Sequence, residues 1–110
     1  MATVDDRAWE TTARLVDWLD GHHRDNDLAP EVIRLLRVLK LSEEVGETTQ
    51  AVIGALGANP RKGTTHKWSD VEHELCDVII TAMVALTTLN PDARMVFTER
   101  LEHVATRSLG

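Results

Sequence analysis

Apolar residues recur every three or four positions along most of the chain, which is the spacing of helices that bury one face. Alternating apolar and polar positions, typical of strands, are not evident, and neither are internal repeats. We therefore expect an all-α fold, a four- to five-helix bundle. The spacing predicts helices from about Val4 to Asp20, from Pro30 to Leu56, from Ser69 to Leu89 and from just after Asn90-Pro91.

Helix-breaking and helix-capping residues punctuate this pattern. Gly21 is expected to stop the first helix, and Pro30 suits the first turn of the second because it has no N–H to lose there. Residues 57–67 contain Asn-Pro and Gly and should form a loop. Ser69 is the predicted N-cap of the third helix, with Glu72 three residues on as in a capping box.

The length of 110 residues predicts a single domain, 1–110, because two independent cores would each be too small. So short a chain gains from burying a helical face against a second copy, so we expect a homodimer or homotetramer. The lone Cys76 excludes an intramolecular disulfide, fits a reducing compartment and is expected to be a buried small residue. We expect no membrane span and no secretory signal, and a cytoplasmic location by default.

The net charge of -6 argues against a protein that coats a nucleic acid polymer, since that requires Lys and Arg to neutralise phosphates. A small phosphorylated ligand remains open, because a metal ion held by carboxylates reverses the local sign of the field.

A polar patch interrupts the apolar stripe in the middle of the second predicted helix, between residues 42 and 49. Such broken patterns often mark function. Gly46 lies inside the patch, and glycine within a helix costs roughly 1 kcal/mol relative to alanine, so a close backbone or ligand approach is a plausible compensation.

Four acidic residues form two pairs with helical spacing. Glu44 and Glu47 are three residues apart in the second helix, so both side chains project from the same side of that helix. Glu74 and Asp77 repeat this spacing in the third helix. If the two helices pack antiparallel, the four carboxylates meet in one groove, where their repulsion requires a cation.

Oxygen ligands without nearby His or Cys favour a hard ion, and we expect Mg²⁺, with Mn²⁺ as a substitute. The alternative is a solvated acidic helix face, which is the ordinary interpretation of a single pair. Asp77 argues against it, because its sequence neighbours are apolar and an unpaired charge among them would be costly.

The segment Lys-Leu-Ser-Glu-Glu-Val-Gly-Glu from Lys40 to Glu47, followed by Glu-Leu-Cys-Asp-Val-Ile-Ile from Glu74 to Ile80, resembles the ExxE and ExxD motif pair of the MazG-like, all-α nucleoside triphosphate pyrophosphohydrolase superfamily. The resemblance covers the second and third helices and is weaker elsewhere. It implies Mg²⁺-dependent cleavage of a nucleoside triphosphate to the monophosphate and pyrophosphate, as in the removal of unwanted nucleotides. The metal ligands it implies are Glu44, Glu47, Glu74 and Asp77.

A carboxylate not fully used by metal would accept the proton of the attacking water, and Glu47 and Glu43 both qualify, with Glu47 favoured. The candidate phosphate-binding cations are Lys40, Arg61, Lys62 and Lys67. The alternatives are a solvated loop for the last three and neutralisation of the acidic cluster by Lys40.

Three further positions concern the nucleotide. Trp68 would either stack on a base or anchor the helix start. In the last helix Arg100 and Arg107 match basic positions of the family, but Val104 stands where its asparagine is expected, which puts the substrate in doubt. The five histidines show no metal-ligand spacing.

Two alternatives stay open. A phosphoribosyl-ATP pyrophosphohydrolase-like enzyme shares the architecture of the family. A helical dimerisation or regulatory module would keep the carboxylates only to bind a metal. A nucleotide panel that includes phosphoribosyl-ATP, assayed for pyrophosphate release, separates all three.

Overall fold

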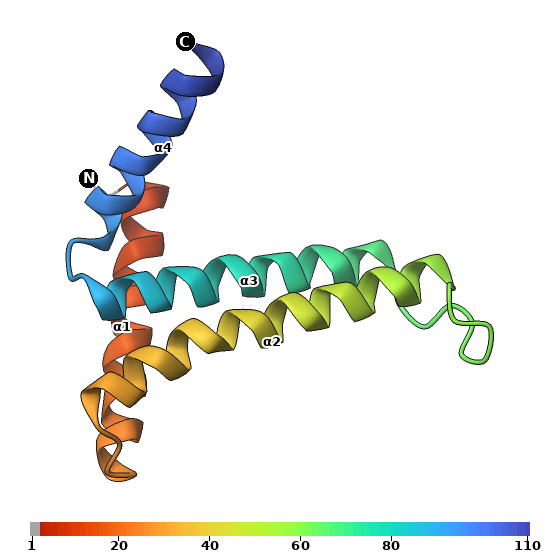
Figure 1. Cartoon of the computed structure of the whole chain (residues 1–110), viewed down its shortest axis with the longest axis horizontal. Helices are drawn as coiled ribbons and strands as arrows, with labels where there is room; N and C mark the ends of the chain where they lie inside the picture. The colour runs from red at the N-terminus through yellow and green to blue at the C-terminus, as the bar shows by residue number, and fades with distance from the viewer. Residues whose placement is uncertain (1–2) are drawn as a thin grey trace. The chain divides into compact units, whose positions relative to one another are not determined.

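The computed structural model describes residues 3–110, and for residues 4 and 5 it describes the backbone alone. Within this range the chain is helical with no strand, so the all-α prediction is confirmed. Its four helices, shown in Figure 1, are α1 (Val4–Asp25), α2 (Pro30–Leu56), α3 (Trp68–Leu89) and α4 (Ala93–Leu109).

The chain divides into two compact units. The first consists of residues up to 28 together with residues 83–110, and the second consists of residues 29–82. The first unit therefore holds α1, α4 and the last turns of α3. The second unit holds α2, the loop after it and most of α3, and all four predicted metal ligands lie in it.

In the first unit a small apolar core forms between the helices. Val16, Val84, Ala85 and Ala93 are buried there, and the ring centroids of Trp9 and Phe97 lie 6.0 Å apart. Polar contacts support the start of α1, where the side chains of Thr3 and Asp6 form a capping box and Arg94 of α4 pairs with Asp6.

The prediction that α1 ends at Gly21 is wrong, because the helix continues to Asp25. A helical backbone tolerates glycine at a modest cost, so Gly21 alone does not end it. The end is set by Asn26, whose side-chain amide donates to the carbonyl of His22 at 2.8 Å, and by the left-handed backbone of Asp27, with φ 54°.

Helix α2 runs unbroken for 27 residues, about 40 Å at 1.5 Å per residue, so the polar patch does not interrupt it. Pro30 occupies its first turn as predicted, and Gly57 ends it in the left-handed conformation, with φ 63°. Figure 1 shows α2 beside α3 and antiparallel to it, with the connecting loop at one end. Ala51, Gly54 and Val71 are buried in this unit.

Helix α3 begins at Trp68, so Ser69 is not its N-cap. The backbone N–H of Lys67 instead donates to Oδ2 of Asp70 at 2.8 Å, which satisfies a donor at the helix start. Cys76, which was expected to be buried, is exposed.

Many large apolar side chains of α2 and α3 are exposed, some by half or more of their surface, including Leu35 at 58% and Ile79 at 59%. The other exposed large apolar residues on these two helices are Val32, Leu36, Val38, Leu39, Val45, Ile53, Leu56, Trp68, Leu75, Ile80 and Leu89. A shallow groove of about 310 Å³ lies among several such residues between Val45 and Ile53 of α2 and Leu75 and Val78 of α3.

No single helix in residues 3–110 is long and apolar enough to cross a membrane, although α3 and α4 together pass the same test as a bent pair, by length and composition alone.

Candidate metal centre

Three of the four predicted ligands converge between α2 and α3. One carboxylate oxygen each from Glu44, Glu74 and Asp77 can be chosen so that all three lie within 4.8 Å of one another. Glu47 is outside this triad but borders it, since its charge and its contact with both glutamates act on Glu44 and Glu74. The antiparallel pairing of the helices therefore gathers acidic groups from both.

Two oxygens of the triad are buried without a hydrogen-bond partner among the described residues. They are Oε2 of Glu44 and Oε2 of Glu74. The Glu44 side chain is 13% exposed and Glu74 is half-buried. Buried carboxylate oxygens that no donor satisfies are costly, so the arrangement suits a bound cation.

The surroundings raise the pKa of both glutamates. Burial is the larger cause for each, and the repulsion of Glu47 comes next. Asp77 raises both pKa values further, whereas Lys40 lowers that of Glu44 and His66 lowers that of Glu74. Carboxylates forced together out of water favour a proton or a metal ion as their counter-charge.

Asp77 does not lie in the apolar environment that its sequence neighbours implied. It is exposed, and the nearby Leu75, Ile79 and Ile80 are exposed too, by 48%, 59% and 44%. Glu44 and Glu74, rather than Asp77, are therefore the members of the triad that the protein has desolvated.

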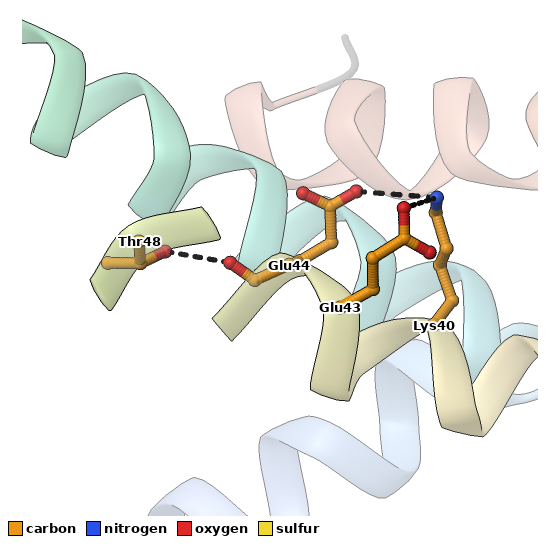
Figure 2. A network of polar contacts seen from close by, with 4 residues as sticks. All are labelled: Lys40, Glu43, Glu44 and Thr48. Carbon is orange, nitrogen blue, oxygen red and sulfur yellow. Dashed lines mark hydrogen bonds and ion pairs between the residues drawn. The ribbon is translucent and has the colours of Figure 1, made fainter. Parts of the chain in front are cut away.

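Lys40 links the acidic residues of α2, as Figure 2 shows. Its Nζ lies 3.0 Å from Oε1 of Glu43 and 3.9 Å from Oε1 of Glu44. The hydrogen bond with Glu43 is the largest cause of a raised pKa for Lys40. One turn further along, the hydroxyl of Thr48 donates to the backbone carbonyl of Glu44 at 3.0 Å (Figure 2). Lys40 thus neutralises part of the negative charge beside the triad.

The glycine that makes a close contact is Gly54 rather than Gly46. A Cβ added to Gly46 would meet no atom within 4 Å, so no described part of the protein approaches it. A Cβ on Gly54 would overlap Nδ1 of His66 and Oγ1 of Thr65 and would lie 2.9 Å from Cγ of His66. The backbone N–H of Thr65 also donates to the carbonyl of Gly54 at 3.0 Å. The end of the loop therefore packs directly on α2.

His66 is the residue near the site that the sequence did not single out. Its ring is half-buried, and its Nδ1 lies 2.9 Å from the hydroxyl of Thr65. It lowers the pKa of Glu74, which is consistent with a place near the acidic cluster. The signal in the sequence was Gly54, a glycine in an apolar stretch of helix. Such a glycine indicates that another part of the chain packs closely on the helix, but it does not identify the residue that does so.

The predicted phosphate-binding residues of the loop are all exposed. Asn59 closes a turn at the tip, where its side chain accepts from the N–H of Arg61 at 3.0 Å and its carbonyl accepts from that of Gly63 at 2.9 Å. Arg61 and Lys62 lie in this turn, whereas Lys67 and the 56% exposed Trp68 lie at the start of α3.

The two basic residues of the last helix belong to the other unit. Arg100 and Arg107 are exposed on α4, and Val104 is half-buried. Their assignment to a nucleotide site therefore stays a prediction from the sequence.

No family model, curated protein or solved structure matches this chain.

Proposed function

We propose that this protein is a Mg²⁺-dependent nucleoside triphosphate pyrophosphohydrolase, which cleaves a nucleoside triphosphate to the monophosphate and pyrophosphate. The observation that carries the proposal is the convergence of Glu44, Glu74 and Asp77 from two antiparallel helices, with oxygens within 4.8 Å of one another. The resemblance of these segments to the MazG-like motif pair points to the same chemistry.

The donor set fits Mg²⁺, with Mn²⁺ as a substitute. All the ligand atoms are carboxylate oxygens, and two of them are buried without partners among the described residues. Mg²⁺ typically takes only a few protein carboxylates and leaves positions for waters and substrate phosphates. When bound, it would neutralise charge on the phosphates and acidify the attacking water.

Glu47 is the preferred general base. It borders the triad and is exposed, and among the described residues the ion pairs of the nearby Lys40 are with Glu43 and Glu44. Glu43, the other candidate, is occupied by its 3.0 Å ion pair with Lys40. In the proposed reaction a water oxygen attacks the α-phosphorus, Glu47 takes the proton, and the bond to the bridging oxygen breaks so that pyrophosphate leaves with its electron pair.

Cations on the loop side of the triad would bind the leaving pyrophosphate. Glu47 and the end of α2 are nine residues apart, about 13 Å along the helix axis, so the turn with Arg61 and Lys62 lies well beyond the cluster. Lys67 and Trp68, at the start of α3, are nearer and are the first candidates to meet the phosphates and the base.

The exposed apolar face of α2 and α3 supports the proposal that a second copy of the chain completes the site. Soluble monomers rarely leave so many large apolar side chains in contact with water. A homo-oligomer, dimer or tetramer, would cover them by symmetry.

A nucleotide panel assayed for pyrophosphate release in the presence and absence of Mg²⁺ tests the activity. Phosphoribosyl-ATP belongs in the panel, since turnover of that compound alone would place the chain in the related enzyme class. Turnover should be lost in Glu44→Gln and in Asp77→Asn, and retained in Glu72→Gln, a matched change on α3 outside the triad. Mg²⁺ binding without any turnover would instead favour a regulatory module.

A further inference from the structure

His66, at the end of the loop, packs against α2 at Gly54. The ring lies against the backbone of Gly54, where any other residue would displace it, and the neighbouring Thr65 is bonded to α2 through its backbone N–H. The hydroxyl of Thr65 is also 2.9 Å from Nδ1 of the ring. Two contacts thus fix the Nδ1 side of the imidazole, and a backbone hydrogen bond holds the neighbouring residue on α2.

Among the described residues, the hydrogen bond recorded for this ring is at Nδ1 and not at Nε2. The two nitrogens of an imidazole lie on different sides of the ring, so a ring tied at Nδ1 presents Nε2 elsewhere. When the Thr65 hydroxyl donates to Nδ1, the proton of the neutral ring resides on Nε2, which becomes a donor.

The position of His66 along α2 relates it to the acidic cluster. Gly54 follows Glu47 by seven residues, two helical turns, so it lies on the same face about 10 Å towards the loop. Side chains of a helix lean towards its N-terminus, so Glu74 of α3 leans in the direction of this end. The influence of His66 on Glu74 is consistent with that arrangement.

His66 therefore lies on the loop side of the proposed metal site, next to Lys67 at the start of α3. A polyphosphate chain bound to the metal at one end and to Lys67 at the other would pass this ring.

We propose that Nε2 of His66 donates a hydrogen bond to the pyrophosphate portion of the substrate and holds the leaving group on the loop side of the acidic triad. This inference rests on the proposed function and adds a substrate-binding residue to it. The competing explanation is that the ring serves only to attach the loop to α2.

Two substitutions separate these explanations. Asparagine at position 66 places a polar group near Nδ1 and leaves nothing at Nε2, whereas glutamine reaches further and its amide can donate from about the position of Nε2. The probe is inorganic pyrophosphate, titrated calorimetrically into the Mg²⁺-loaded full chain. Binding of Mn²⁺ alone, followed by electron paramagnetic resonance, is the second readout.

We expect His66→Asn to weaken pyrophosphate binding by roughly ten- to a hundredfold, the effect of a lost hydrogen bond to a charged group. His66→Gln should recover most of this loss, and both variants should bind Mn²⁺ as the wild type does. Thr65→Val, which removes the partner of Nδ1, gives a second test and should weaken pyrophosphate binding by about three- to tenfold.

Three results would overturn the inference alone: wild-type pyrophosphate affinity in His66→Asn, an equal loss in the Asn and Gln variants with the fold intact by circular dichroism, or a parallel loss of Mn²⁺. A wild-type chain that binds neither Mn²⁺ nor pyrophosphate would overturn the proposed function and this inference together.

Discussion

Replacing Gly54 by alanine tests how the loop that joins α2 and α3 is held against α2. The added methyl group would overlap the ring of His66 and the hydroxyl of Thr65. The same substitution at Gly46, eight residues earlier in the same helix, would place the methyl group where no atom lies within 4 Å. The two variants therefore form a matched pair that differs mainly in this contact.

The expected free energies of unfolding change in opposite directions. Both variants gain roughly 1 kcal/mol because alanine favours a helix over glycine. Gly46→Ala keeps this gain. Gly54→Ala also has to displace the loop, at a cost of about 1–3 kcal/mol for overpacking and about 1 kcal/mol for the bond between the Thr65 N–H and the Gly54 carbonyl. The variants should differ by about 2–4 kcal/mol.

Thermal unfolding followed by circular dichroism, with a chelator present to exclude bound metal, measures the difference. For a chain of this size 1 kcal/mol corresponds to roughly 4–8 °C in melting temperature. Gly46→Ala should melt above the wild type and Gly54→Ala below it. If Gly54→Ala proves as stable as Gly46→Ala, the packing of the loop on α2 described above is refuted.

Three further changes have defined outcomes. Burial and the charge of Glu47 raise the pKa of Glu44 in the folded protein, so the contribution of Glu44 to stability is lost as pH rises through this raised folded pKa. Without metal, Glu44→Gln should therefore melt at a higher temperature than the wild type at pH 7. It should also lose the roughly 1.4–2.7 kcal/mol that Mg²⁺ at ten to a hundred times its Kd confers on the wild type, and an unchanged Mg²⁺ shift in calorimetry would contradict the site. The hydrogen bonds from Thr3 lower the pKa of Asp6, so its contribution is complete above the ordinary value of 3.8 and is lost as pH falls through the lower folded value. When stability is measured against pH, Asp6→Asn should lack the loss of stability that protonation of Asp6 causes in the wild type at low pH. Identical stability curves for Asp6→Asn and the wild type would contradict this contribution of Asp6. Ile79→Glu places a charge on the exposed apolar face and should reduce the mass measured by light scattering to that of one chain; a wild type that is itself monomeric would argue against the oligomer.

Signals that act within a few residues predicted the helices well. The apolar spacing, Pro30 at the start of α2 and Gly57 after its end are all local, and each has the predicted place. The end of α1 was misplaced because Gly21 permits a left-handed turn without requiring one. Asn26 and Asp27 supply that turn through a side-chain bond and a positive φ, which the sequence spacing does not reveal.

The sequence selected the three acidic residues that converge in the structure, but it did not predict their surroundings. Helical spacing alone selected two acidic pairs, because it fixes which side chains share a face. Which carboxylates are buried depends on how α2 and α3 are rotated against each other, so Glu44 and Glu74, rather than Asp77, proved to be the desolvated ones. The role of Gly54 depends on residues eleven and twelve positions later, beyond the reach of any local pattern.

The apolar side chains that α2 and α3 leave exposed have a consequence for how the stability of the protein depends on its concentration. If a second copy of the chain covers them, folding is coupled to association. The melting temperature then rises with protein concentration. Dilution then lowers the stability of the folded protein. Binding or activity assays at nanomolar concentration would then measure a less stable protein than spectroscopy at millimolar concentration, so the two kinds of experiment should be compared at the same protein concentration.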